Sequence, residues 1–485
     1  MDPTAPSSQE TEPNVNAPAP RLPISGPFEF LRPSVEVGPQ GTRVSLPYRI
    51  TSAEGPLELT EVVQLPVPAT VSDELLAAVR VLHLFAGVSY YKAVAPTALV
   101  VPRLSQAERA AVTALYDSGL REFAYRNGFD VPLPVELVED AGDLSPVHHL
   151  AAGVEAGGST GAPSGALVPV GGGKDSALVA SLVPDGRLFS VNPVGAQVHL
   201  AEALGRPLLA VTRTLAPELR HLVAAGVPNG HVPVTAITSA VAVLTAVAVG
   251  AADVVMGIER SADEPSLVTP DGVPVNHQYS KSSEAERLLQ AAFEPTGVRW
   301  FSLLRPLTEL AIGAAVAARG LGADIVSCNR VFTVWNETTA SRTQKACGEC
   351  AKCLFTALML APGSEPEAIA TQYGSALLDR TDHVDGVREL WSDEKPFDCV
   401  GERHESAAAV SLLADLPGWS HQEVISTLRD EARRVLAADR LEAGRFLEIG
   451  PVDDLPAEYR QRVADLRADV AAVVASVGGP DRGSR

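Results

Sequence analysis

The chain has 485 residues, of which 46% are hydrophobic and 20% are charged. This length allows about three domains of roughly 150 residues each, and the composition supplies an ample core. The formal net charge of −20 argues against a protein that grips DNA or RNA through its overall field. Five cysteines, three of them bunched, form no disulfide framework, so we expect a cytoplasmic protein that binds neither nucleic acid nor membrane.

The N-terminal part combines a polar tail with strand and helix patterns. Residues 1–26 are rich in proline and polar residues and lack an apolar core or a basic start, which predicts a disordered tail rather than a signal peptide. From residue 28 to 68, apolar and polar residues alternate between Gly and Pro breaks, as in β-hairpins. Helical spacing follows over residues 73–83 and 105–128. Residues 27–152 are therefore predicted to form an α+β domain.

The central part has the pattern of a parallel sheet. After a linker or mobile loop rich in Gly, Ala and Ser at residues 153–165, short apolar strands alternate with helices up to about residue 362. This alternation predicts a parallel sheet with crossover helices over residues 165–362, with its binding crevice at the carboxyl ends of the strands. The predicted strands are residues 165–170, 188–192, 208–212, 254–258, 300–304 and 324–328.

Two further regions are predicted to be helical. Residues 232–252 carry no charge but contain Ala, Thr and Ser and lack basic anchors, which favours a buried helix over a membrane span. Residues 363–477 form a C-terminal helical region, most clearly over residues 412–437 and 455–477. Residues 478–485 are expected to be a disordered tail.

Residues 168–176, Val-Pro-Val-Gly-Gly-Gly-Lys-Asp-Ser, form a glycine-rich turn between an apolar strand and a helix. Gly171, Gly172 and Gly173 allow the backbone to bend and a ligand to approach closely. Their N–H groups, together with those of the new helix, make an anion site to which Lys174 adds a positive charge. The Walker pattern would require Ser or Thr after the lysine, where this chain has Asp175. A glycine-rich loop without a ligand is the simpler alternative.

A second constellation is a group of cysteines. Cys347, Cys350 and Cys353 are each separated by two residues, and Cys328 lies nineteen residues before the first. This spacing suits four thiolates around a structural zinc ion. An iron–sulfur cluster, a pair of acid and base thiols in a racemase, or four idle thiols would also fit the sequence. Cys399 stands apart and is interpreted as a small buried apolar side chain.

The loop and the cysteines carry a resemblance. The loop resembles the Ser-Gly-Gly-x-Asp-Ser motif of the PP-loop ATP-pyrophosphatases, with Gly171 in place of the first Ser. The resemblance implies a central domain like that of the adenine nucleotide alpha hydrolases. Other segments resemble the UDP-N-acetylmuramoyl-L-alanyl-L-glutamate epimerase family: Leu-Phe-Ala-Gly-Val-Ser-Tyr-Tyr-Lys at 84–92, Gly-His-Val-Pro-Val-Thr-Ala at 230–236, Val-Asn-His-Gln-Tyr-Ser-Lys-Ser at 275–282 and Lys-Pro-Phe-Asp-Cys at 395–399.

The epimerase resemblance implies a reaction in peptidoglycan precursor synthesis, next to a ligase that adds L-glutamate. The substrate would be UDP-N-acetylmuramoyl-L-alanyl-L-glutamate, and the product would carry D-glutamate. ATP would cap the carboxylate as an acyl-adenylate with release of pyrophosphate, so that a modest base can remove the α proton. Reprotonation from the other face inverts the centre, and water releases AMP.

Site roles follow from charge and position. The residues expected to hold ATP are Gly171, Gly172, Gly173, Lys174, Asp175 and Ser176, with Asp175 acting through magnesium or capping the helix. His277, Tyr279 and Lys281 are the candidate bases, and His277 has the most suitable ordinary pKa. Glu259, with Arg260 and Ser261, would bind magnesium or substrate, or pair with an arginine. Arg305 would meet a phosphate or a carboxylate.

Three residues of the N-terminal part and one histidine have weaker assignments. Tyr90, Tyr91 and Lys92 would close over the uridine or the sugar, although ordinary packing is the simpler interpretation for the tyrosines. His231 follows a turn and would be structural as readily as functional. Two other functions remain open: a PP-loop enzyme acting on tRNA or a 7-cyano-7-deazaguanine precursor, and a non-catalytic nucleotide-binding module. The acidic chain argues against tRNA, and the charged loop argues against a mere module.

Overall fold

The computed structural model describes residues 24–52, 55–140, 142, 144–151, 162–331, 346–392, 395–398 and 400–477. The predicted C-terminal tail, most of the predicted N-terminal tail, most of the linker and Cys399 lie outside the described residues. The first strand begins at Ile24, within the last residues of the predicted N-terminal tail.

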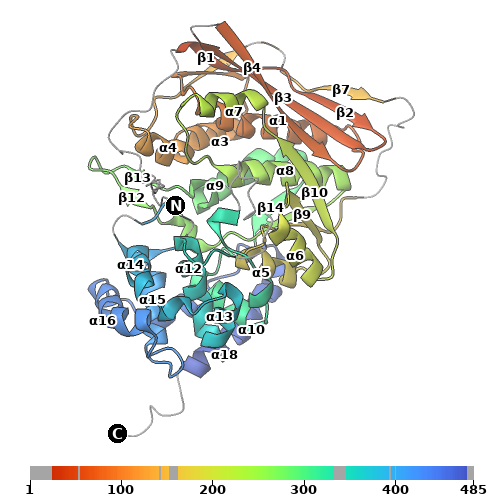
Figure 1. Ribbon diagram of the computed structural model, residues 1–485. Coiled ribbons are helices and arrows are strands. Elements are labelled where there is room, and N and C mark those ends of the chain that lie inside the picture. Colours follow the sequence, from red (N-terminus) through yellow and green to blue (C-terminus); the bar gives the residue numbers. More distant parts are fainter. Residues whose placement is uncertain are drawn as a thin grey trace, which may run out of the picture.

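The N-terminal part contains the predicted hairpins. Strands β2 and β3 pair antiparallel with Gly38 opposite Gly41, and β3 continues into β4 with Ser52 opposite Gly55. Strand β1 joins β3 antiparallel, β5, β6 and β7 are added in parallel, and helix α1 packs beneath the sheet (Figure 1). These elements are β1 (Ile24–Phe30), β2 (Ser34–Gly38), β3 (Gly41–Ser52), β4 (Gly55–Leu65), α1 (Asp73–Ala86), β5 (Ala98–Pro102), β6 (Glu136–Asp140) and β7 (Val147–Leu150).

The single helix predicted over residues 105–128 is wrong. The segment contains α3 (Gln106–Tyr116), a short 3-10 turn at Ser118–Leu120 and α4 (Arg121–Arg126). Asp117, with φ −91° and ψ −85°, ends the first helix. Gly119 then lies so close to Pro233 that an added Cβ would sit 3.1 Å from its ring. The break between α3 and α4 therefore lies where the chain packs against Pro233, although the hydrophobic spacing predicted one continuous helix.

Five parallel strands form the second half of the sheet: β8 (Ala166–Pro169), β9 (Arg187–Val191), β10 (Leu208–Thr214), β11 (Asp253–Met256) and β14 (Arg299–Ser302). Their order is β14-β11-β8-β9-β10, so the order reverses between β8 and β11. In open parallel sheets ligands bind at this switch point, beyond the carboxyl ends of the strands. Strand β10 also pairs antiparallel with β4, which joins both halves into one 12-stranded, mostly parallel sheet.

The central parallel strands β8, β11 and β14 are largely buried on both faces, whereas β10 alternates buried and exposed residues. Successive side chains of a strand point to opposite faces, and two cores follow from this alternation. Leu167 and Trp300 belong to the core that includes α1, α8 (Val234–Val249) and α9 (Ser283–Phe293). Their neighbours Val168 and Phe301 belong to the core formed with α5 (Lys174–Leu182), α10 (Glu309–Ala318) and the C-terminal helices.

The strand predicted at residues 324–328 is wrong, whereas the five other strands of that prediction are confirmed. Residues Gly322–Asp324 form a 3-10 turn, and the following residues join no strand ladder. Val326 instead donates one hydrogen bond of 2.8 Å to the carbonyl of Gly172. Ile325 and Val326 are buried, so their apolar character reflects packing beside the glycine loop rather than a place in the sheet.

The uncharged segment at residues 232–252 forms α8, which ends at Gly250 in the left-handed conformation. Its middle residues are buried against α1 and the sheet, as predicted. Among the described residues, no single helix is both long and apolar enough to span a bilayer. Glu309–Ala318 and Gly322–Val331 meet that length and composition test only as a pair, across a bend of 107°.

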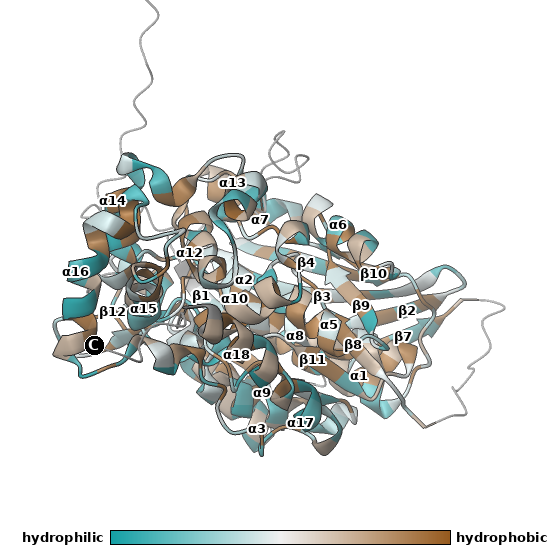
Figure 2. Cartoon of the chain, turned by 90° about the horizontal axis from the view of Figure 1, so that it is seen from below, coloured by the Kyte–Doolittle hydropathy of each residue, from teal (hydrophilic) through white to brown (hydrophobic). Residues whose placement is uncertain are grey.

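Helix α12 (Ala351–Leu360) precedes the C-terminal region. That region is helical, as predicted: α13 (Pro366–Tyr373), α14 (Val384–Arg388), α15 (Arg403–Leu413), α16 (Glu423–Ala438), α17 (Ala457–Ala464) and α18 (Leu466–Val477). The predicted helical piece at residues 412–437 is interrupted, because Pro417 and Gly418 lie in a turn between α15 and α16. Figure 2 shows α16 at the periphery with many hydrophilic residues, while its apolar stripe packs on α15.

Candidate functional site

The glycine loop lies directly beyond β8, at the switch point of the sheet. Gly172 has a φ of +82°, and an added Cβ would lie 3.0 Å from Ala196. Gly173 has equally little room, since a Cβ would lie 2.9 Å from Oγ of Ser327. Ser176 fastens the turn by accepting from the N–H of Gly171 at 3.2 Å and donating to the carbonyl of Gly173 at 3.1 Å.

Helix α5 begins at this loop and presents its amino end to the same space. No side chain caps its first turn, so its N–H groups remain available for an anion. Gly171 has open space around its Cα, in contrast to the two glycines that follow. The strand, turn and helix amino terminus predicted around the three glycines are thus present in that order.

Lys174 is buried in an ion-pair network, with 1% of its surface exposed. Its ammonium pairs with Asp175 at 2.5 Å and with Glu309, which lies at the start of α10. Burial alone would lower the pKa of Lys174, but Asp175, Glu309 and Glu259 together raise it above its ordinary value. Lys174 therefore stays cationic and holds the three carboxylates together.

These three carboxylates form a cluster that has the composition of a divalent-cation site. Oxygens of Asp175, Glu259 and Glu309 all lie within 4.8 Å of one another. Oε1 of Glu259 is buried and has no hydrogen-bond partner among the described residues. Burial, followed by the charges of Asp175 and Glu259, raises the pKa of Glu309 against the opposing charge of Lys174. A hard cation with oxygen ligands would relieve this repulsion.

Sequence reasoning missed one carboxylate of this cluster and two charged residues beside it. Glu309 is one of its carboxylates, and Lys352 lies with its ammonium 4.0 Å from Oε1 of Glu309. Glu405 is fully buried beside them and accepts a hydrogen bond from Ser261. Burial and the charge of Glu309 raise the pKa of Glu405 well above its ordinary value. One sequence feature could have identified Glu309: it is the charged first residue of an otherwise apolar helix.

Arg305 lies beside the cluster and supports two loops. Its guanidinium donates to the carbonyl of Glu259 at 2.7 Å and to that of Lys281 at 2.9 Å, and it pairs with Glu286 at 2.5 Å. These contacts use the N–H groups of the Arg305 guanidinium. Arg305 therefore positions Glu259 and Lys281 in this structure rather than facing the glycine loop. Glu259 itself lies where it was predicted, beyond the end of β11.

His277 and Lys281 lie between the carboxylate cluster and the N-terminal part. Nδ1 of His277 is 2.6 Å from Oγ of Ser266, and its Nε2 is buried without a partner among the described residues. Burial, followed by the charge of Lys281, lowers the pKa of His277 to about 4, so the ring is neutral near pH 7. The charge of Lys281 also acts on Asp175 and so links the two groups.

His231 stands face to edge with His277, and the ring centroids are 5.7 Å apart. The N-terminal part holds its turn in place: Glu122 accepts from the N–H of His231 at 3.0 Å. Lys92 donates to Oδ1 of Asn229 at 2.6 Å and to the carbonyl of Gly230 at 3.0 Å. Lys92 therefore braces the loop that carries His231.

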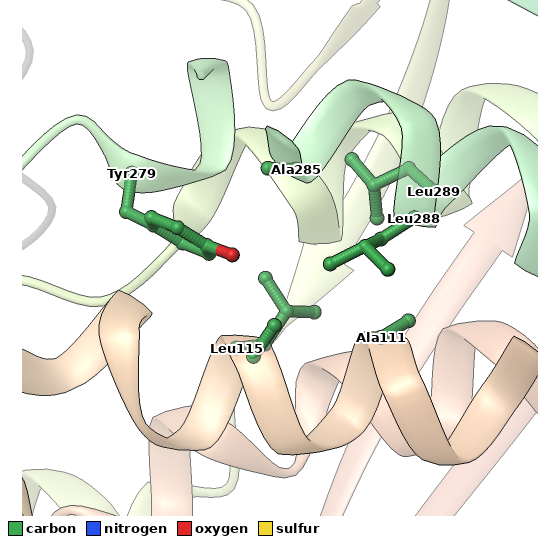
Figure 3. Close-up of a pocket in the computed structure, with 7 residues that line it drawn as sticks. Ala111, Leu115, Tyr279, Ala285, Leu288 and Leu289 are labelled. Carbon is green, nitrogen blue, oxygen red and sulfur yellow. The ribbon is translucent and has the colours of Figure 1, made fainter. Parts of the chain in front are cut away.

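Tyr279 packs between two helices. Its ring lines a small apolar gap between α3 and α9, beside Leu115, Leu288 and Leu289 (Figure 3). The gap has no room for a water molecule, so this position favours packing for Tyr279. Tyr90 and Tyr91 are also buried in the N-terminal core. This position favours ordinary packing over contact with the uridine or the sugar.

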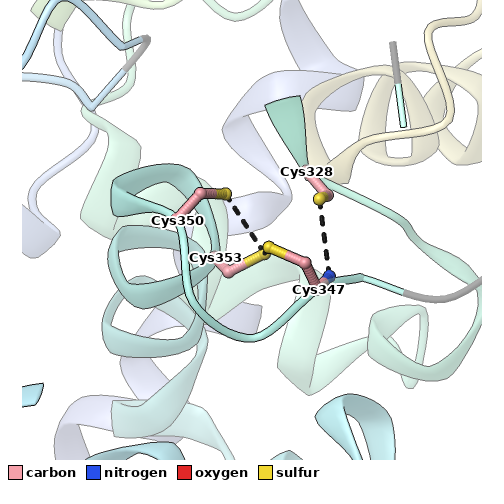
Figure 4. A group of neighbouring side chains, drawn as sticks. All are labelled: Cys328, Cys347, Cys350 and Cys353. Carbon is pink, nitrogen blue, oxygen red and sulfur yellow. Dashed lines mark hydrogen bonds between the residues drawn. The ribbon is translucent and has the colours of Figure 1, made fainter. Parts of the chain in front are cut away.

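The four cysteines predicted to bind a metal are brought together beside the glycine loop. Their Sγ atoms all lie within 4.8 Å of one another (Figure 4). None of the four is in a disulfide. Fold and site thus define an α/β protein in which a glycine loop, buried carboxylates and a four-cysteine group meet at the carboxyl edge of a parallel sheet.

Comparison with known proteins shows which family has this sequence. The family model of the MurL N-terminal domain matches residues 25–303, and that of the MurL C-terminal domain matches residues 324–443. The UDP-N-acetyl-alpha-D-muramoyl-L-alanyl-L-glutamate epimerase of Salinispora tropica is 42% identical over 86% of this chain and 92% of its own length. Epimerases of the same name from a Micromonospora strain and from Xanthomonas oryzae pv. oryzae are 38% and 35% identical, over 90% and 84% of this chain and 97% and 91% of their own lengths.

No solved structure shows a significant match. The chain belongs to the MurL family of epimerases, and it is an isomerase. The resemblance found in the sequence is thereby confirmed.

Proposed function

We propose that this enzyme uses ATP to convert the terminal L-glutamate of UDP-N-acetylmuramoyl-L-alanyl-L-glutamate to D-glutamate. The substrate is the one in the names of its relatives, which are 35% to 42% identical to this chain. The single observation that carries the use of ATP is the meeting of the glycine loop with Lys174 and the carboxylates of Asp175, Glu259 and Glu309.

Each part of this site has a role with phosphates. The N–H groups of the loop and of the first turn of α5 would bind the pyrophosphate end of ATP. Asp175, Glu259 and Glu309 would hold magnesium, which neutralises charge on the phosphate oxygens. Placement of the central domain in the PP-loop superfamily is part of this proposal, and it rests on the loop sequence and on the switch-point position.

The chemistry requires activation because the α proton of a free amino-acid carboxylate is very weakly acidic. The carboxylate oxygen attacks the α phosphorus, the bond between the α and β phosphates breaks, and pyrophosphate leaves. The acyl-adenylate carries no carboxylate charge, so a base can remove the α proton. A proton returns to the opposite face, and water then releases AMP and restores the carboxylate. Hydrolysis of ATP drives an equilibrium that otherwise stops near an even mixture.

His277 is our first candidate for the group that takes the α proton. It is neutral near pH 7, and its Nε2 is buried without a partner among the described residues. A general base must be unprotonated and within reach of the proton that it removes. Lys281 is the second candidate, since its charge acts on both Asp175 and His277.

Product analysis tests the proposal. Purified full-length protein with Mg-ATP should release AMP and pyrophosphate in the presence of the L-alanyl-L-glutamate precursor. UDP-N-acetylmuramoyl-L-alanine is the matched control, because it has a carboxylate but no glutamate, and it should release neither. Release of ADP and phosphate would contradict cleavage between the α and β phosphates. Epimerisation without ATP would contradict activation altogether.

A further inference from the structure

The four-cysteine group has the dimensions of a site for one metal ion. Sγ of Cys353 lies 3.5 Å from that of Cys350 and 3.8 Å from that of Cys347. Zinc–sulfur bonds of about 2.3 Å in a tetrahedron place the sulfurs about 3.8 Å apart. The separations exceed a disulfide bond of about 2.05 Å by a wide margin. We propose that Cys328, Cys347, Cys350 and Cys353 bind one zinc ion.

The surroundings of the sulfurs favour this assignment over its alternatives. Backbone N–H groups of Cys347 and Glu349 point at Sγ of Cys328 and Cys347, each at 3.4 Å, as outer hydrogen bonds to metal-bound thiolates do. Acid and base thiols on opposite faces of a substrate carbon need that carbon between them, and sulfurs 3.5 to 3.8 Å apart leave no such space. An iron–sulfur cluster has several metal atoms inside its thiolates and needs a wider group.

The position of the site indicates what the zinc does. Cys328 follows Ser327 and Val326, and Val326 donates to the carbonyl of Gly172 at 2.8 Å. Ser327 packs on Gly173, with its Oγ 2.9 Å from the place of a Cβ. Fixing Cys328 therefore fixes the segment that supports the glycine loop.

The cysteine group also contacts the carboxylate cluster through Lys352. Lys352 lies between Cys350 and Cys353, and its ammonium reaches to 4.0 Å from Oε1 of Glu309. The metal thus acts as a structural brace that holds the glycine loop on one side and places Lys352 on the other. All four ligand positions are filled by thiolates, so no position is open for a substrate. This inference is independent of the reaction proposed above.

Metal analysis of the purified full-length protein is the first test. Growth in zinc-supplemented medium should give about one zinc per chain, released when an organomercurial titrates the thiols. A colourless protein is expected. A metal-free folded protein with freely reactive cysteines would overturn the proposal, and so would iron with visible absorption.

A pair of variants assigns the ligands. Cys347→Ser should reduce zinc to below about 0.2 per chain, because loss of one thiolate of four weakens binding strongly. Cys399→Ser is the matched control and should retain the full amount, since four ligands complete the site without it. Zinc retained in Cys347→Ser, or lost in Cys399→Ser, would show that the ligand set is wrong.

Hydrogen exchange on the unsubstituted protein tests the brace and does not depend on whether a variant folds. Removal of zinc with the mercurial should speed amide exchange about 10-fold or more in peptides covering residues 170–178 and 322–331. Peptides from β3 and β4 should be unchanged. Unchanged exchange in the loop peptides after zinc loss would overturn the brace.

Discussion

Lys174 and Glu309 form a buried ion pair although 135 residues separate them in the sequence. Lys174 opens helix α5 and Glu309 opens helix α10, so the amino ends of two helices meet at one point of the sheet edge. The carboxylate of Glu309 is also the meeting point of Asp175, Glu259 and Lys352.

Glu309→Gln should lower turnover by about 10²-fold or more, on the scale of losing one charge-stabilising group in an enclosed site. The variant should also require more magnesium for half-maximal rate, because the proposed magnesium site would lose one of its three carboxylates. Pyrophosphate release over a magnesium series measures both effects. Glu442→Gln, at an exposed position, is the control. An unchanged rate and magnesium requirement in Glu309→Gln would exclude Glu309 from the metal site.

The lysine and the aspartate of the glycine loop should also be needed for turnover. Lys174→Ala and Asp175→Asn should each lower turnover by about 10²-fold or more while the protein stays folded. Circular dichroism and a melting curve check the fold, and pyrophosphate release gives the rate. A sharply lower melting temperature with a preserved rate per folded molecule would assign both residues to stability alone.

Two neighbouring glycines should respond differently to the same substitution. Gly172→Ala should lower the free energy of unfolding by about 1–2 kcal/mol, because an L side chain is strained at a φ of +82°. Gly171→Ala should leave it unchanged, since nothing lies within 4 Å of an added Cβ. Urea unfolding measures both. A raised KM for ATP in Gly171→Ala would then report close approach of the nucleotide, and equal destabilisation of the two variants would contradict the loop geometry.

His83 should make the protein less stable in acid. Burial lowers its pKa to about 4, whereas the unfolded chain returns it to 6.5. The unfolded state therefore binds more protons between these values, and the stability due to neutral His83 is complete above pH 6.5 and lost as the pH falls toward 4. In His83→Gln the stability difference between pH 7 and pH 5 should shrink by up to about 2 kcal/mol. Urea unfolding at the two pH values checks this, and an unchanged difference would contradict it.

The proposed base can be separated from the ATP chemistry in heavy water. The unsubstituted enzyme should place one deuterium at the α carbon of the product glutamate, because the removed proton exchanges with solvent. His277→Ala should still form AMP and pyrophosphate but return L-configured precursor without deuterium, and Lys281→Ala is the second variant to examine. Mass spectrometry and chiral analysis give the readout. D-configured product that keeps its original hydrogen would indicate one shielded base instead.

Tyr279→Phe distinguishes packing from catalysis. The ring lies against Leu115 and Leu289, so removal of a hydroxyl that takes no part in proton transfer should change turnover less than about 3-fold. Tyr279→Ala should instead lower the melting temperature, because removal of the ring enlarges the apolar gap that it lines. A loss of about 10²-fold in Tyr279→Phe with normal stability would return Tyr279 to the list of proton-transfer groups.

The sequence alone determined those features that arise within a few residues. A run of three glycines before Lys174 specifies a tight turn, and cysteines at two-residue gaps specify a compact thiol group, because both depend on local backbone geometry. Alternating apolar strands and helices likewise gave five of the six predicted strands of the parallel sheet. The segments at 84–92 and 275–282 carried the family resemblance.

Only the tertiary structure decided which distant charges share a site. Glu309 and Lys352 showed no motif, and their roles follow from helix ends that the sheet order brings together. Arg305 has the right charge to bind a phosphate or a carboxylate, yet its guanidinium donates to two backbone carbonyls. Residues 324–328 had the apolar pattern of a strand, but the glycine loop and the cysteine group hold them outside the sheet. In each case burial and pairing over long sequence separations overrode the local pattern.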